Sequence, residues 1–219
     1  MTLSRQQIAA RVALDIPDGS YVNLGIGVPT LVADFLPDDR EIILHTENGL
    51  LGMGPAAAGN EVDEDLINAG KIYVTEVPGS SYFHHADSFA MMRGGHLDYC
   101  VLGAFQVSVR GDLANWRTNS PTAIPGVGGA MDLAMGAKHV YVVMDLLTKS
   151  GESKLVTACD YPLTGAECVE RVYTDHALFE LGEDGVRVLD LYVDMSIRDL
   201  EALVGIPLLD ATAASIMST

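Results

Sequence analysis

Short apolar runs, partly β-branched, recur along the first two thirds of the chain and are separated by stretches with helical or loop character. Their length of about five to ten residues is typical of strands. The runs occupy residues 41–45, 71–77, 99–109 and 139–147, and residues 21–29 form a short strand that breaks into a glycine loop. Because strands alternate with helical segments, we expect an α/β fold with an open, mainly parallel sheet flanked by helices.

Polar residues ahead of apolar stripes indicate where the helices begin. Ser4 with Gln7 predicts a capping box that opens the first helix. Thr30 predicts the N-cap of a second helix, and Thr164 with Glu167 predicts a capping box for a third. These signals place helices after the first strand and well into the last third of the chain.

The last third has a different character. Residues 178–193 contain two strand-like runs joined around Asp184–Gly185, which is a hairpin signal. A terminal helix is expected between the cap residue Ser196 and the closing residue Gly205. No internal repeat, low-complexity tract or linker interrupts the chain, so we expect a single domain over residues 1–219.

Charge and composition restrict the classes of partner. The chain has 13 basic and 30 acidic residues and a formal net charge of -17. Such a field repels nucleic acid and anionic membranes, so we expect neither as a partner. An anionic substrate would need a local basic group. No apolar run approaches the roughly 18 residues of a membrane span, and the N-terminus does not resemble a signal peptide, so we expect a cytoplasmic protein.

Metal binding is not expected from the ligand-type residues. The three cysteines form no close pair and leave one over, which argues against a disulfide framework or a zinc site. His84 and His85 are adjacent, whereas metal-binding histidines on a helix are usually four residues apart. A reducing compartment fits this cysteine usage.

Gly25 and Gly27 lie between a predicted strand and a predicted helix. Glycines at such a position let backbone N–H groups approach an anionic ligand. A dinucleotide-binding loop is one interpretation, but its third glycine is replaced by Thr30. A purely structural tight turn is the other, and the residues alone leave both open.

Glu47 ends an apolar strand and is followed by Asn48–Gly49. Because Asn-Gly is a strong turn signal, a solvated glutamate in a hairpin or loop is the simpler interpretation. Against it, the long flexible glycine-rich connection expected to follow carries three apolar residues that favour burial, Leu50, Leu51 and Met53. A partly desolvated carboxylate at this point could act as a nucleophile in covalent catalysis.

Two further features are candidates for ligand binding. Gly128 and Gly129 precede a short helical run, where they form either a plain connection or a loop of backbone donors for an oxyanion or phosphate. Lys71 opens a predicted strand and is either solvated or paired with an anionic group.

Taken together, several longer motifs resemble one family. The segments "VNLGIGVPTL", "ENGLLGMGP", "DLINAGK", "SFAMMRGGHLD", "GDLANW" and "GGAMDL" are similar to the B (beta) subunit of the glutamate-dependent family I 3-oxoacid CoA-transferases, over about residues 4–191. The likeness implies the CoA-transferase (NagB/RpiA-like) fold. Within the family, "YFHHADSFAMMRGGHLD" and "VGGAMDLA" are more similar to the branch that uses 3-oxoadipate than to the branch that uses acetoacetate.

The resemblance also implies a mechanism. Glu47 would be the catalytic nucleophile in a ping-pong transfer of CoA from succinyl-CoA to a 3-oxoacid, through a glutamyl-CoA thioester. CoA is then a substrate, and no resident cofactor or metal is implied. The oxyanion or CoA-binding roles fall on Asn23, Gly25, Gly27, Lys71, Gly128 and Gly129.

The resemblance also implies a partner subunit that this chain does not supply. The active site resembles one that is shared with an alpha subunit on a separate polypeptide, in a heterodimer or an α2β2 assembly. One position departs from the pattern, because Thr46 stands where the family usually has serine. The hydroxyl is kept, so we expect function to survive. The alternative of another class is a non-catalytic module that binds a sugar phosphate or a dinucleotide.

Overall fold

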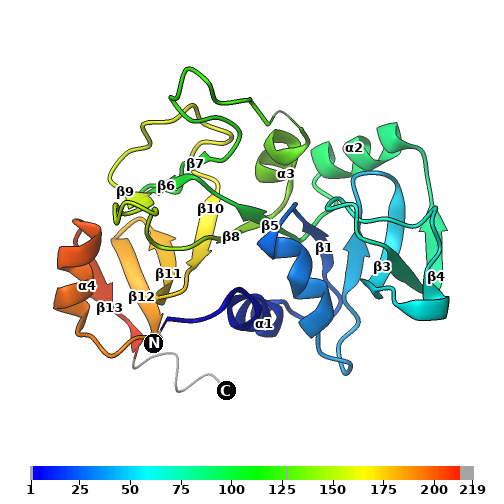
Figure 1. The fold of residues 1–219 in the computed structure, drawn as a ribbon, viewed down its shortest axis with the longest axis horizontal. Coiled ribbons are helices and arrows are strands. Elements are labelled where there is room, and N and C mark those ends of the chain that lie inside the picture. The colour runs from blue at the N-terminus through cyan, green and yellow to red at the C-terminus, as the bar shows by residue number, and fades with distance from the viewer. Residues whose placement is uncertain (1, 127, 213–219) are drawn as a thin grey trace. The chain divides into compact units, whose positions relative to one another are not determined.

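The computed structural model describes residues 2–126 and 128–212 (Figure 1). Backbone contacts group the chain into two compact units. We call residues 9–103 with 129–140 the Glu47 unit, and residues 1–8, 104–128 and 141–219 the hairpin unit. The chain passes through each unit more than once, and the expectation of a single domain over residues 1–219 stays a prediction.

The sheet of the Glu47 unit has a parallel centre. β1 (Tyr21–Leu24) pairs in parallel with β2 (Ile43–His45) on one side and with β5 (Tyr99–Gly103) on the other. β3 (Leu50–Ala56) continues the sheet antiparallel to β2, and β4 (Val74–Tyr82) is antiparallel to β3. The strands β1 and β5 are almost fully buried, as expected for parallel strands.

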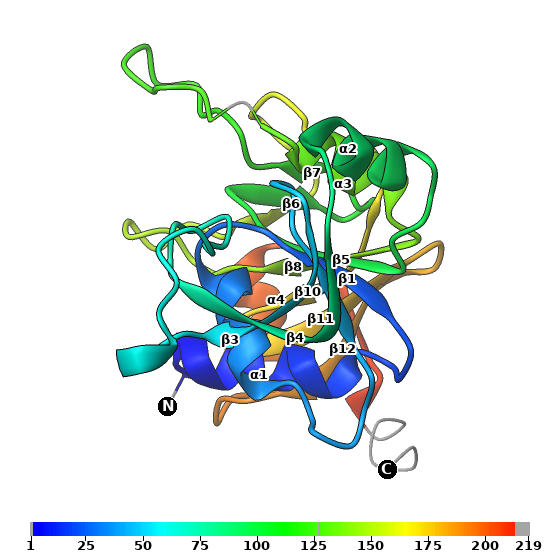
Figure 2. The ribbon, with the colours of Figure 1, turned by 90° about the vertical axis from the view of Figure 1, so that its right-hand side faces the viewer.

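Helices accompany this sheet. They are α1 (Arg5–Asp15), which begins in the hairpin unit, the 3₁₀ helices η1 (Val28–Phe35) and η2 (Gly59–Glu61), α2 (His85–Arg93) and α3 (Ala130–Gly136). α2 and α3 lie side by side (Figure 2). With the parallel centre of the sheet, these helices confirm the α/β prediction.

The hairpin unit holds a largely antiparallel meander. β10 (Val169–Tyr173), β11 (Ala177–Gly182) and β12 (Gly185–Leu191) pair antiparallel in that order, and β13 (Leu208–Asp210) adds in parallel to β12. The hairpin predicted around Asp184–Gly185 is confirmed, because Gly182 pairs with Gly185 at the end of the β11–β12 ladder.

The remaining elements of this unit are small. β8 (His139–Val143) enters from the Glu47 unit, and its last residues lie next to β10. A three-stranded sheet has the order β7 (Leu113–Ala114), β6 (Gln106–Ser108), β9 (Leu155–Val156). The unit also contains the helix α4 (Ile197–Val204).

Two of the predicted helix caps are confirmed. Ser4 and Gln7 exchange side chain to backbone hydrogen bonds ahead of α1, at 3.3 and 2.8 Å. Ser196 and Asp199 form a complete capping box on α4. Gly205 ends α4 in the left-handed region with φ 72°, where a residue without a β-carbon is favoured.

Two other predicted caps are wrong. η1 begins at Val28 with Gly27 as its N-cap, and the Thr30 hydroxyl instead donates back to the Gly27 carbonyl at 2.7 Å. No helix follows Thr164, because the valine-rich segment beyond it forms strand β10. The Thr164 hydroxyl donates to the Asn115 side chain at 2.6 Å.

Several predicted strands differ from the observed ones in their bounds, and two cases have an evident cause. The run at residues 71–77 becomes a strand only at Val74, because Lys71 lies in a turn with φ 60°. The run at residues 99–109 divides into β5 and β6, which belong to different units. Its apolar character is explained by burial in both places.

Candidate active site

The carboxyl ends of β1 and β2 meet at one edge of the sheet in the Glu47 unit. The register pairs Asn23 with His45, so the loop after β1 and the turn after β2 leave the sheet side by side. Gly25 follows β1, and Glu47 follows β2. Open parallel sheets bind their ligands beyond the carboxyl ends of their strands. This edge is therefore where an active site is expected.

Glu47 occupies a tight β-hairpin turn between β2 and β3. The Thr46 N–H donates to the Leu50 carbonyl at 2.8 Å, and the Gly49 N–H donates to the Thr46 carbonyl at 3.2 Å. Gly49 has φ 108°, and a β-carbon there would collide with the carbonyl oxygen of Phe83. Asn48–Gly49 is thus the hairpin turn that its sequence predicts, and the same turn holds Glu47.

The segment after the turn is a strand, so the expectation of a long flexible glycine connection is wrong. Gly52 and Gly54 lie within β3, next to two irregularities in its pairing with β4. Gly54 packs so closely against Thr75 that a side chain would collide with the threonine hydroxyl. The expected burial of Leu50 and Met53 is confirmed, whereas Leu51 is half-buried.

The Thr46 hydroxyl closes this turn. Its Oγ1 accepts a hydrogen bond from the Leu50 N–H at 2.9 Å, and Thr46 itself is buried. A serine hydroxyl could make the same bond. The threonine that replaces the serine of the similar family therefore keeps the interaction that shapes the turn.

The Glu47 side chain is half-buried and lies against Gly129, the residue before α3. A β-carbon on Gly129 would stand 2.8 Å from Cδ of Glu47, closer than real carbon contacts. Within the described residues, no side chain or backbone donor forms a hydrogen bond or ion pair with this carboxylate. The structure thus brings Glu47 together with one of the glycines that the sequence singled out.

Two buried polar residues beside Glu47 were missed by the sequence reasoning. His45 ends β2 and is 2% exposed, and Ser88 in α2 is fully buried. The His45 Nε2 atom is 3.0 Å from the Ser88 hydroxyl, and its Nδ1 atom is 3.0 Å from the Asn23 amide. A histidine that closes an apolar strand just before the candidate nucleophile is the signal that could have drawn attention to this group.

Burial controls the protonation of His45. Removal from water disfavours the charged imidazolium and lowers the pKa of His45 from 6.5 to about 4. The ring also stacks on Phe83, with 5.9 Å between centroids and 21° between planes. His45 is therefore a neutral imidazole at physiological pH.

Asn23 lies under the site, and its amide is already engaged. Its Nδ2 group donates both to the His45 ring and to the His45 carbonyl, the latter at 3.1 Å. A ligand contact through these hydrogens would break one of the two bonds. The oxyanion or CoA-binding role expected for Asn23 stays a prediction.

Gly25 and Gly27, which follow β1, each have a local structural reason to be glycine. The Gly25 N–H donates to the Val101 carbonyl at 2.8 Å, and a β-carbon there would press on Leu102. Gly27 has φ 94°, and it caps η1. Gly128 is exposed, with open space where its β-carbon would be. Gly25 and Gly27 therefore meet a local structural need and Gly128 shows none, and the roles of all three in ligand binding stay predictions.

Lys71 lies in a tight turn. The segment before this turn is hydrogen-bonded to the Glu47 hairpin. Asn68 Oδ1 accepts hydrogen bonds from the N–H groups of Gly70 and Ile72, at 2.8 and 3.1 Å, and so closes the turn. Asn48 donates to the Ile67 carbonyl at 3.2 Å. The turn thus exposes a lysine on a segment anchored to the residue after Glu47.

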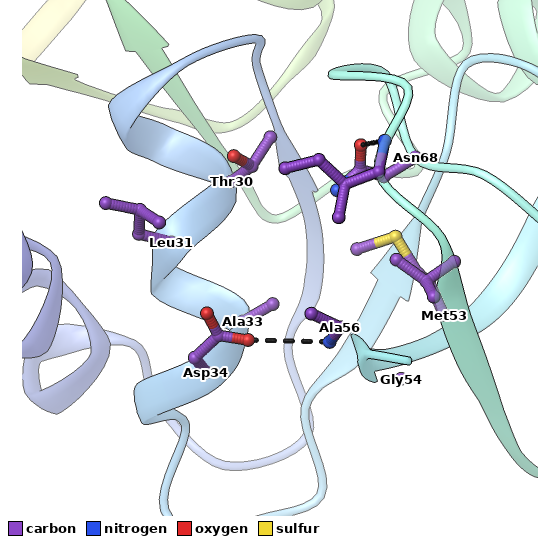
Figure 3. A pocket seen from close by; sticks show the side chains of 10 residues that line it. Thr30, Leu31, Ala33, Asp34, Met53, Gly54, Ala56 and Asn68 are labelled. Atoms are coloured by element: carbon purple, nitrogen blue, oxygen red, sulfur yellow. Dashed lines mark hydrogen bonds between the residues drawn. The ribbon is translucent and has the colours of Figure 1, made fainter. Parts of the chain in front are cut away.

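A small surface pocket lies between η1 and the strands β3 and β4 (Figure 3). Thr30 and Asp34 from η1 line one side, and Met53 and Asn68 face them. Neither Glu47 nor Gly129 lines it. This pocket therefore belongs to the packing of η1 and carries no part of the candidate chemistry.

Neither a metal centre nor a membrane span is found in the described part of the chain. Across residues 2–126 and 128–212, no cluster of three or more histidine, cysteine or acidic side chains has the arrangement of a metal site. No helix among those residues has the length and apolar character needed to cross a bilayer.

The coenzyme A transferase family matches residues 5–192, so the chain belongs to this family. The B subunit of a 3-oxoadipate CoA-transferase of Pseudomonas putida is 61% identical over 207 residues, which cover 94% of this chain and 97% of that protein. Its counterpart in Acinetobacter baylyi is 58% identical over 210 residues, covering 96% and 97%. The match confirms the family resemblance seen in the motifs.

A more distant relative and two solved structures are also similar to this chain. The B subunit of a probable succinyl-CoA:3-ketoacid coenzyme A transferase of Bacillus subtilis is 46% identical over 200 residues, covering 91% of this chain and 92% of its own. An acyl-CoA transferase of Escherichia coli superposes with a TM-score of 0.72 at 18% identity, covering 97% of this chain, which spans 44% of that longer protein. A glutaconate coenzyme A-transferase from Acidaminococcus fermentans gives 0.67 at 17% identity, covering 94% and 86%. The structures support the fold alone.

Proposed function

We propose that this chain is the nucleophile-bearing subunit of an enzyme that moves CoA from succinyl-CoA to a 3-oxoacid, with 3-oxoadipate as the preferred acceptor. The observation that carries the proposal is the half-buried Glu47 carboxylate, which lies against Gly129 without a hydrogen-bonded partner among the described residues. A carboxylate whose lone pairs are not engaged by donors keeps its nucleophilicity. The names of the relatives from P. putida and A. baylyi support the choice of acceptor.

The first half of the reaction moves CoA onto the enzyme. A Glu47 oxygen attacks the thioester carbonyl of succinyl-CoA, the C–S bond breaks, and CoA leaves as a thiolate, giving a mixed succinyl-glutamyl anhydride. The thiolate then attacks the Glu47 carbonyl carbon, the C–O bond to the succinyl group breaks, and succinate leaves. The product is a glutamyl-CoA thioester.

The second half is the same sequence in reverse. The carboxylate of the 3-oxoacid attacks the glutamyl-CoA thioester and expels the CoA thiolate. The thiolate attacks the 3-oxoacyl carbonyl of the new anhydride, so that 3-oxoacyl-CoA leaves and the Glu47 carboxylate is restored. No proton is transferred, and no general base is needed, because each attacking group is a carboxylate or a thiolate.

The protein must stabilise the oxyanions that form in each attack. Gly129 lies against the carboxylate, and Gly128 precedes it in the chain, so we assign the backbone N–H groups of both to this role. One such donor typically contributes a factor of about 10²–10³ in kcat. Lys71 is assigned to an anionic group of the substrate, because a local cation must offset the net charge of -17.

The proposal includes a partner subunit. The relatives are named as B subunits, which supports a separate alpha subunit that completes the site. We propose a cytoplasmic heterodimer or α2β2 assembly that uses CoA as substrate and needs no resident cofactor.

Substitution of the nucleophile tests the activity. In the complex with the partner subunit, Glu47→Gln removes the negative charge but keeps the shape, so transfer should fall to background while the complex still assembles. Glu61→Gln is the matched control, because Glu61 is exposed in η2 and undergoes the same change of charge. Transfer by Glu47→Gln at the rate of the control would refute the assignment.

A competition between acceptors tests the substrate. Wild-type complex is supplied with succinyl-CoA and either 3-oxoadipate or acetoacetate. A higher kcat/KM for 3-oxoadipate supports the proposed acceptor. A higher value for acetoacetate instead places the chain in the succinyl-CoA:3-ketoacid branch of its B. subtilis relative.

A further inference from the structure

Three buried side chains form a continuous hydrogen-bonded chain beneath the Glu47 turn. Asn23 comes from β1, His45 from β2 and Ser88 from α2, and each is at most 3% exposed. The chain runs from the Asn23 amide to the His45 ring, then to the Ser88 hydroxyl, and ends on the Thr46 carbonyl. We call these residues the Asn23–His45–Ser88 relay.

The direction of each hydrogen bond follows from its partners. The Asn23 Nδ2 group faces the His45 carbonyl, which can only accept, so the amide orientation is fixed. The same group then donates to His45 Nδ1, which must be the unprotonated ring nitrogen. The ring proton therefore resides on Nε2 and is donated to Ser88 at 3.0 Å. The lowered pKa of His45 agrees with a neutral ring in this tautomer.

The relay ends on the peptide group that joins Thr46 to Glu47. The Ser88 hydroxyl donates to the Thr46 carbonyl at 3.2 Å, and the carbon of that carbonyl is bonded to the Glu47 nitrogen. The same oxygen also accepts the turn bond from the Gly49 N–H. This turn bond and the Thr46 hydroxyl close the hairpin without Ser88. The Ser88 hydroxyl is therefore not needed to form the turn. Its contribution is to fix how the Thr46–Glu47 peptide is oriented.

We infer that the Asn23–His45–Ser88 relay positions the Glu47 carboxylate for attack on the thioester. His45 and Ser88 are positioning residues, because they act on Glu47 through the Thr46 carbonyl and form no hydrogen bond with its carboxylate. The inference rests on the proposed function, in which Glu47 is the nucleophile. It gives a role to two residues, His45 and Ser88, that have none in the transfer chemistry itself.

A positioning role predicts a particular kinetic signature. A displacement of about 1 Å at the reacting group can lower a rate by about 10²-fold. Loss of the relay should therefore lower the rate of glutamyl-CoA formation and kcat, whereas the KM for succinyl-CoA should change little. A purely structural role would lower stability without this separation of kcat from KM.

Ser88→Ala is the main test, and Ser20→Ala is its matched control. Both hydroxyls are buried and donate to a backbone carbonyl, but Ser20 bonds Pro17 at 2.7 Å, ahead of β1 and away from its carboxyl end. In the complex with the partner subunit, we expect both variants to have similar melting temperatures. Ser88→Ala should lower single-turnover glutamyl-CoA formation by about 10-fold or more. Ser20→Ala should leave this rate within about 2-fold of wild type.

Replacement of His45 gives a rescue experiment. In His45→Gln the side-chain amide can reach the Nε2 position and donate to Ser88, so most of the rate should return relative to His45→Leu. The relay is overturned if Ser88→Ala reacts as fast as Ser20→Ala. This result is distinct from failure of the proposed function, in which Glu47→Gln itself would remain active in the same assay.

Discussion

The absence of a side chain on Gly129 leaves the space that the Glu47 carboxylate occupies. A β-carbon there would lie 2.8 Å from Glu47 Cδ. Gly129 has φ -68° and ψ -2°, which any L-amino acid adopts readily. Glycine is thus needed at position 129 to leave room for Glu47, and not because of its backbone conformation.

Gly129→Ala should therefore damage the chemistry more than the fold. The new methyl group displaces the Glu47 carboxylate, so we expect kcat to fall by about 10²-fold with little change in melting temperature. Gly182→Ala is the control, since its nearest neighbour outside the chain-adjacent residues is 3.9 Å away and its φ is not positive. Equal kcat for the two variants would show that the carboxylate does not need its present position.

Thr46 offers a test of what shapes the turn. In Thr46→Val the Leu50 N–H loses the hydroxyl oxygen at 2.9 Å and has no replacement in a buried site. We expect the free energy of unfolding to fall by about 1–3 kcal/mol, measured by denaturant titration. Thr46→Ser keeps the oxygen and should retain wild-type kcat. A Thr46→Val variant as stable as Thr46→Ser would contradict this role of the hydroxyl.

Burial of His45 predicts a pH dependence of stability. Its pKa is lowered from 6.5 to about 4 in the folded chain, so the unfolded chain binds the proton more tightly. Stability from the neutral ring is therefore complete above pH 6.5 and is lost as the pH falls toward 4, by up to about 3 kcal/mol. His45→Gln removes the titrating group and should flatten this part of the curve. An unchanged slope between pH 6.5 and 4 in the variant would exclude His45 as its source.

The Lys71 turn allows charge to be separated from backbone conformation. Lys71 has φ 60°, a left-handed value that asparagine also tolerates well. Lys71→Asn should therefore keep the turn but remove the ammonium group, raising KM for succinyl-CoA by about 10-fold or more. Lys149→Asn is the control, because Lys149 is an exposed turn lysine in the hairpin unit. A KM for Lys71→Asn equal to that of the control would remove Lys71 from substrate binding.

Much of the fold can be predicted from local signals. The capping pairs Ser4 with Gln7 and Ser196 with Asp199 have only short-range requirements, so the sequence shows them directly. The same holds for the hairpin at Asp184–Gly185. Thr164 is not a cap because the N–H of Asn115, a residue distant in the sequence, donates at 3.1 Å to the hydroxyl oxygen that a cap would use as its acceptor.

The site was predicted only in part, because some of its contacts join residues that are distant in the sequence. The family motifs identified Glu47 and Gly129, which the fold does bring together. His45 and Ser88 were missed because their roles depend on a contact between β2 and α2 that no local pattern encodes. The glycines of β3 resemble a flexible loop in the sequence, because their close approach to β4 is visible only once the strands are paired.

The most direct test of the central claim is to locate the covalent intermediate. The wild-type complex is incubated with succinyl-CoA without acceptor, treated with borohydride, which reduces a thioester but not a carboxylate, and digested for peptide mass mapping. We predict a reduced side chain at Glu47 and its absence in Glu47→Gln. A reduced residue elsewhere, or none in a complex that still transfers CoA, would contradict the assignment of Glu47 as the nucleophile.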